Sequence, residues 1–71
     1  AAFFNICKNK LLELGCTILH SNNNNHILYS NNHENLIVMV HDINNNSFYI
    51  RLYMNTESNR SYWINSLDSN S

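Results

Sequence analysis

The stretch Leu36–His41 reads Leu-Ile-Val-Met-Val-His, and it decides the fold. β-branched and other apolar residues of this kind favour a β-strand, and the run is too apolar to form the exposed edge of a sheet. The sequence therefore predicts an inner strand over residues 36–42.

The residues that follow predict a neighbouring strand. Asn44, Asn45 and Asn46 form a turn signal, because asparagine tolerates positive φ better than any residue except glycine. Over residues 47–55, large side chains then alternate between two faces. One face carries Phe48, Ile50, Leu52 and Met54, and the other carries Tyr49, Arg51 and Tyr53.

Shorter segments complete the predicted sheet. Residues 16–20 and 27–30 are β-prone pieces on either side of a run of four asparagines. After a polar turn over residues 55–59, the Ser-Tyr-Trp-Ile segment favours a further strand, which we expect over residues 61–67.

The first fourteen residues carry a helical period. Apolar residues recur at i, i+3, i+4, i+8 and i+11, namely Phe3, Ile6, Cys7, Leu11 and Leu14. Gly15 stands where a helix end favours a residue in the left-handed conformation. The pattern predicts a helix over residues 2–14.

These elements predict one small α+β domain over residues 1–71, with an N-terminal amphipathic helix packed on an antiparallel sheet of four to five strands. We expect the helix face of Phe3, Cys7, Leu11 and Leu14 to pack on the sheet face that carries Phe48, Ile50, Leu52 and Met54. A helix about 10 Å wide covers roughly two strands spaced about 4.8 Å apart. Apolar side chains from Phe48, Ile50, Leu52 or Trp63 should then stay uncovered, as in a domain that lacks a second, C-terminal helix.

Composition narrows the classes of function. The net charge is −1, and charged residues make up 13% of the chain, half the usual share of about 25%. Asparagine takes their place with 16 residues, a bias typical of an AT-rich coding genome. The four basic residues are scattered, whereas nucleic-acid binding and acidic-membrane binding need clustered positive charge. We therefore expect no nucleic-acid partner and weak or no membrane binding.

The cysteines and the absence of a targeting signal indicate the compartment. No apolar run approaches the roughly 20 residues that span a bilayer, and no signal peptide is visible. Two cysteines without a disulfide framework are typical of a reducing, intracellular and cytoplasmic setting. A disulfide between Cys7 and Cys16 is not expected, because nine residues of mostly helical chain separate them by about 13 Å.

No pattern predicts catalysis, a cofactor or a metal site. Of the six soft ligands, only Cys16 and His20 have a plausible local spacing for zinc; the others are Cys7, His26, His33 and His41. We expect the cysteines to be small core residues and the histidines to lie in loops. The chain has one glycine and no phosphate-binding loop, and its carboxylates lie in solvated positions.

The aromatic residues give the candidate site. Tyr49, Tyr53, Tyr62 and Trp63 lie on two segments that the 55–59 turn would make neighbours. Such a row can stack on single-stranded bases, yet the shortage of positive charge favours a protein interface. The prediction is an apolar patch with Tyr62 or Trp63 as its aromatic anchor.

One segment resembles a known family. The order of helix and strands, followed by Arg51-Leu-Tyr and then by Asn59-Arg-Ser-Tyr-Trp-Ile-Asn-Ser-Leu-Asp, is similar to the C-terminal regulatory domain of AMP-activated protein kinase catalytic subunits. That domain is related to kinase-associated domain 1 of other serine/threonine kinases. Here the turn after Tyr53 is longer, Asn65 stands where the family has Asp, and the aromatic–basic pair before Ser66 is missing.

The resemblance implies a regulatory, non-catalytic function. It implies docking to partner subunits or to a kinase domain in the same chain, and a further C-terminal helix beyond this segment. The alternative is an unrelated small β-rich interaction module, including a single-strand nucleic-acid binder that uses the tyrosines.

Overall fold

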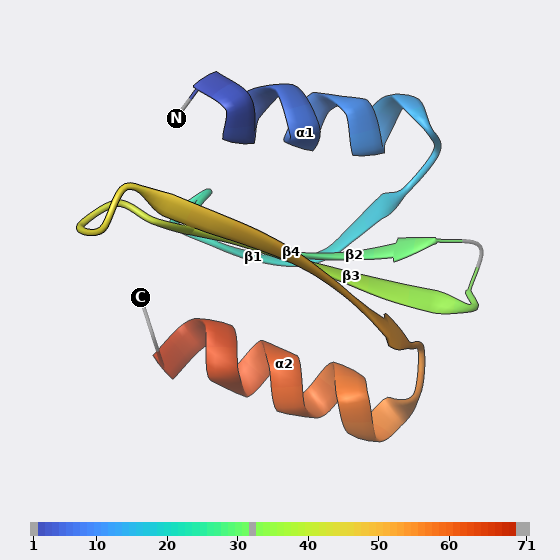
Figure 1. Cartoon of the computed structure of the whole chain (residues 1–71). Coiled ribbons are helices and arrows are strands. Elements are labelled where there is room, and N and C mark those ends of the chain that lie inside the picture. Colours follow the sequence, from blue (N-terminus) through green and yellow to red (C-terminus); the bar gives the residue numbers. More distant parts are fainter. Residues whose placement is uncertain (1, 32, 70–71) are drawn as a thin grey trace.

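The computed structural model describes residues 2–31 and 33–69 and has three layers (Figure 1). A four-stranded antiparallel sheet lies between two helices, so the predicted α+β class is confirmed. In chain order the elements are α1 (Ala2–Glu13), β1 (Thr17–Asn22), β2 (His26–Asn31), β3 (Asn35–Asp42), β4 (Ser47–Met54) and α2 (Glu57–Ser69).

The sheet is a meander in which each strand pairs with the next along the chain, in the order β1-β2-β3-β4. The predicted strands over 16–20, 27–30, 36–42 and 47–55 correspond to β1, β2, β3 and β4. The run that begins at Leu36 lies inside the sheet, as expected, and its residues from Leu36 to Met39 are buried on both faces. β1 and β4 are the two edge strands.

Asparagine closes both outer hairpins. Asn23 and Asn24 have φ of 55° and 59° in the β1–β2 turn, the conformation that a type I′ hairpin turn requires at both central positions. The β3–β4 turn is held by Asp42, whose carboxylate accepts hydrogen bonds from the backbone N–H groups of Asn44 and Asn45. The asparagine runs thus shape the turns.

Helix α1 ends as the sequence predicts. Gly15 has φ of 89°, the backbone N–H of Cys16 donates to the carbonyl of Leu11, and the N–H of Gly15 donates to the carbonyl of Leu12. This pair of hydrogen bonds is a Schellman motif, which satisfies carbonyls that the helix end leaves unpaired.

The packing of α1 corrects one expectation. Phe4, Cys7 and Leu11 contact an inner-strand cluster made of Ile27, Tyr29, Ile37 and Met39. β4 contributes only Phe48 to this cluster, while Phe3 and Leu14 remain exposed. The helix therefore covers the middle of the sheet, because β2 and β3 supply apolar side chains to both faces.

The C-terminal segment corrects a second expectation. Residues 61–67 are not a fifth strand but part of α2, so the domain has the second helix that we expected it to lack. Thr56 caps this helix, since its hydroxyl accepts a hydrogen bond from the backbone N–H of Asn59 at 3.1 Å. Trp63 and Leu67, one helical turn apart, are buried against a cluster on the second sheet face that comprises Leu28, Leu36 and Val38.

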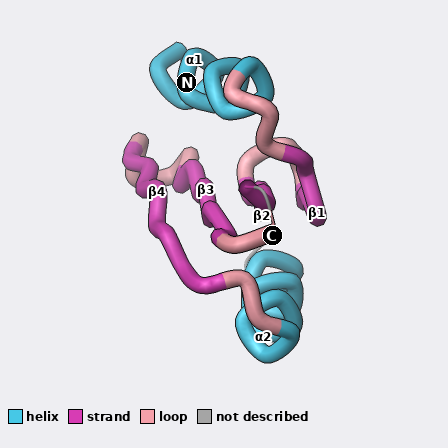
Figure 2. Tube along the Cα trace, turned by 90° about the vertical axis from the view of Figure 1, so that its right-hand side faces the viewer, coloured by secondary structure: helices cyan, strands magenta, loops and turns pink. Residues whose placement is uncertain are grey.

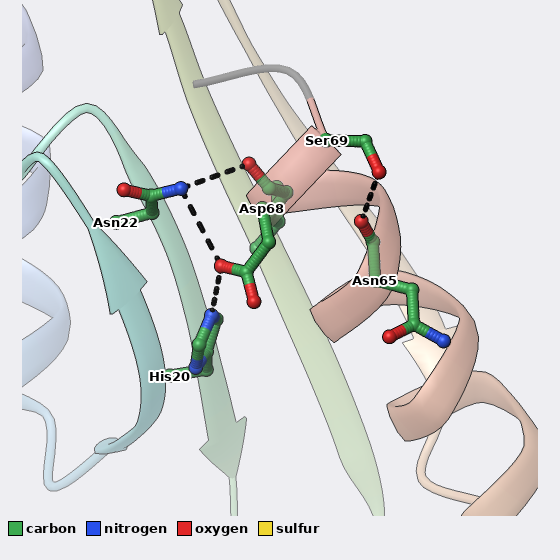
Figure 3. A network of polar contacts seen from close by, with 6 residues as sticks. His20, Asn22, Asn65, Asp68 and Ser69 are labelled. Atoms are coloured by element: carbon green, nitrogen blue, oxygen red, sulfur yellow. Dashed lines mark hydrogen bonds and ion pairs between the residues drawn. The ribbon is translucent and has the colours of Figure 1, made fainter.

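Polar contacts fasten the C-terminal end of α2 to strand β1 (Figure 3). His20 Nε2 lies 2.6 Å from Asp68 Oδ1, and the side-chain amide of Asn22 donates to the carbonyl of Leu67 and to Asp68 Oδ1. Asp68 was expected to be a solvated carboxylate. It instead makes a contact across 48 residues of sequence that holds α2 under β1.

Candidate interaction surface

The four predicted contact residues lie on β4 and α2. Tyr49 and Tyr53 are on β4, and Tyr62 and Trp63 are on α2, the element that follows β4 in the chain. Figure 2 shows α2 beneath the sheet on the side of β1 and β2, while β4 stands at the opposite edge. The face of β4 that points to the α2 layer is thus only partly covered.

Trp63 joins the aromatic side chains but does not itself reach the solvent. It is only 7% exposed and packs in the core, whereas Tyr62 beside it is 63% exposed. The Trp63 ring lies 5.1 Å from the ring of Tyr53 and 5.2 Å from that of Tyr62, in tilted and edge-to-face geometries. Trp63 therefore packs against both tyrosines from the core, and Tyr62 is more exposed than Tyr49, which is 37% exposed.

Arg51 is a member of this surface that the sequence reasoning did not single out. Its guanidinium lies 4.4 Å from the centre of the Tyr49 ring, a cation–π geometry. A hydrogen bond with the Tyr53 side chain, together with the neighbouring Tyr49 and Tyr62, raises the pKa of Arg51. The i, i+2, i+4 spacing of Tyr49, Arg51 and Tyr53 was the available signal, since it places all three on one face of a strand.

We call Tyr49, Arg51, Tyr53 and Tyr62 the tyrosine–arginine surface. It offers three phenol hydroxyls, one permanent positive charge and several aromatic faces. Its side chains are held by contacts with one another and with the core residue Trp63, so they lose little conformational freedom on binding. Tyrosine and arginine are also enriched at protein interfaces.

The opposite face of β4 is apolar. Ile50, Leu52 and Met54 are 46%, 66% and 70% exposed, and Ile50 and Leu52 are among the residues that were expected to stay uncovered. They stand beyond the reach of α1, on the same face as the buried Ile37 and Met39 of β3. We call these three residues the apolar strip.

A polar hollow of about 580 Å³ adjoins the tyrosine–arginine surface. His26, His41, Asp42, Tyr49 and Leu67 are among the residues that line it. His26 Nδ1 is the only buried side-chain nitrogen or oxygen atom among the described residues that lacks a hydrogen-bond partner. The carboxylate of Asp42, in contrast, already accepts three hydrogen bonds within the β3–β4 turn.

The potential metal ligands do not assemble. Cys7 and Cys16 are free thiols that pack around the α1 core, and His20 contacts Asp68. Within residues 2–31 and 33–69, no group of three His, Cys, Asp or Glu side chains could hold a metal ion. In the same residues, neither helix has the length and apolar character needed to cross a bilayer.

Comparisons of the chain with protein families, with curated proteins and with solved structures found no significant match.

Proposed function

We propose that this chain is a non-catalytic regulatory docking domain, and that a protein partner binds the tyrosine–arginine surface. The observation that carries the proposal is a pair of contacts: Tyr53 and Tyr62 pack on the buried Trp63, and Arg51, between Tyr49 and Tyr53 on β4, stacks on Tyr49. Rigid aromatic side chains beside one arginine are the residue types that dominate binding energy in protein interfaces.

The chemistry of this surface favours a partner segment that offers hydrogen-bond acceptors. Arg51 and the tyrosine hydroxyls donate, so backbone carbonyls or a carboxylate of the partner would fit them. In keeping with the resemblance to regulatory domains of AMP-activated-type kinases, the proposed partner is a kinase subunit or the kinase domain of the same polypeptide. The proposed setting is the cytoplasm, where Cys7 and Cys16 would stay reduced.

Photo-crosslinking tests this function. A photoreactive phenylalanine analogue at Tyr62 should form an adduct with a kinase subunit or kinase domain in the cells that produce the protein. The same analogue at Leu12 is a matched control, because Leu12 is also exposed but lies on α1, on the other side of the sheet. Equal adducts from both positions, or adducts only with proteins unrelated to kinases, would contradict the proposal.

Binding of single-stranded nucleic acid is the second candidate, because exposed tyrosines can stack on bases. It is weaker on two observations: Arg51 already occupies a face of Tyr49, and the guanidinium of the nearby Arg60 donates to Asn55. A strand-binding groove needs several cations along the phosphate backbone. We expect no anisotropy change for a labelled oligothymidine at low salt, and tight binding would favour this candidate instead.

A further inference from the structure

Strand β4 has an open outer edge. It is the last strand in the sheet order, so one row of its backbone N–H and C=O groups lacks a strand to pair with. Proteins usually protect such an edge with a proline, a bulge or several charges. β4 has no proline, its pairing with β3 runs without a break from Ser47 to Met54, and its only charged residue is Arg51.

The apolar strip runs along this same edge. Ile50, Leu52 and Met54 are spaced two residues apart, so they form a row on one face of β4. An added strand would be stabilised in two ways at such an edge: by main-chain hydrogen bonds to the unpaired groups of β4, and by burial of the exposed apolar row.

The sequence of β4 is complementary to itself. Two copies can meet edge to edge in antiparallel orientation about a two-fold axis normal to the sheet. The α1 face of both copies then lies on the same side of the joined sheet. Even-numbered residues of one β4 therefore lie opposite even-numbered residues of the other. With the axis at Ile50, Ile50 faces Ile50 of the second copy. Phe48 then faces Leu52, which joins the apolar residues of both copies into one row. On the other face, Tyr49 lies opposite Arg51, the same pair of residue types that already stack within one chain.

The other possible centres fit less well. An axis at Arg51 would set two like charges directly opposite each other, which destabilises a strand pair. An axis at Leu52 would pair only residues 50–54 within the strand bounds, whereas the axis at Ile50 pairs residues 47–53. Length and charge therefore select the same register.

We propose that β4 pairs with β4 of a second copy of this chain, antiparallel and centred on Ile50, to form a continuous eight-stranded sheet. This inference goes beyond the proposed docking function, because it adds main-chain pairing along the edge of β4. The two interfaces share Tyr49 and Arg51, whereas Tyr62 on α2 takes no part in the strand pairing. One pair of seven-residue segments buries less surface area than the interfaces of obligate dimers do. We therefore expect reversible association with a Kd on the order of 10 μM.

A charge-complementation experiment on the full chain tests the register. Ile50→Glu and Ile50→Lys each place like charges face to face at the axis, so each variant alone should dimerise at least about tenfold more weakly in sedimentation equilibrium. An equimolar mixture of the two should recover the dimer, because a glutamate then faces a lysine. Ile50 is 46% exposed, so each variant should fold, and far-UV circular dichroism is the check on folding.

Leu52→Glu and Leu52→Lys form the matched control pair. In the proposed register residue 52 faces Phe48, and the two copies of residue 52 lie about four residues apart along the strands, roughly 13 Å, beyond the Debye length of about 8 Å at physiological salt. Mixing these variants should therefore give no recovery. Wild-type protein that stays monomeric at about fifty times the expected Kd would overturn the proposal. Recovery at residue 52 and not at residue 50 would overturn it as well. Neither result would affect crosslinking from Tyr62, so the docking function is tested separately.

Discussion

Replacing Leu67 with alanine tests how α2 closes the second face of the sheet. Leu67 is 2% exposed and packs among the residues Leu28, Leu36 and Val38. Leu67→Ala removes three carbon atoms, which at about 0.8 kcal/mol for each buried methylene loses about 2.4 kcal/mol of transfer free energy. The cavity left behind brings the total to about 2–5 kcal/mol. A 71-residue domain has a free energy of unfolding of roughly 4–11 kcal/mol, so the loss is a large part of its stability.

Urea unfolding followed by far-UV circular dichroism measures this loss. The midpoint should fall by at least about 1 M for Leu67→Ala, and the melting temperature should fall by about 10 °C or more. Leu52→Ala is the control, because it makes the same chemical change at a side chain that is 66% exposed, and it should stay within about 0.5 kcal/mol of wild type. If Leu52→Ala lowered the free energy of unfolding more than Leu67→Ala, then Leu67 would not be buried against the sheet, and the position of α2 would be wrong.

Three further changes probe separate features. Gly15→Ala should cost about 1–2 kcal/mol from backbone strain alone, because Gly15 has φ of 89° and nothing lies within 4 Å of an added Cβ; an unchanged melting temperature would contradict this. Burial, and to a smaller extent the charge of Cys16, raises the pKa of Tyr29 above its ordinary value of 10.0, so its contribution to stability is complete below that pH and is lost as the pH rises through the folded-state pKa. Thermal melts across this range should show a smaller loss for Tyr29→Phe than for wild type. Asp68→Asn should lower stability by about 0.5–1 kcal/mol, since the contact with His20 is partly open to solvent, and a double-mutant cycle that gives no coupling would rule the contact out.

The sequence predicts those parts of the fold that depend on residues close together in the chain. The apolar run from Leu36, the alternation of β4 and the glycine after α1 each depend on neighbouring residues, and each prediction agrees with the structure. Helix α2 was missed because Tyr62, Trp63 and Ile64 all favour strands individually. Its helical signal is spread out: a capping threonine at position 56, and then the spacing from Trp63 to Leu67.

The candidate site was only partly predictable, because exposure depends on the order of the strands. Alternation shows that Ile50, Leu52 and Met54 share a face, but only the sheet order shows that this face belongs to an edge beyond the reach of α1. The contact between His20 and Asp68 joins two ordinary polar residues 48 positions apart, and nothing in the local sequence of either residue marks it.

The meander order of the sheet has a consequence for how the chain folds. Each strand finds its partner in the segment next to it, so three hairpins can form without closing long loops. The slow steps are then the docking of α1 and α2, since Phe4 reaches the ring of Phe48 and Leu67 packs with Leu28 across most of the chain. Folding on the millisecond scale is therefore expected, with the sheet forming before the helices settle on its two faces.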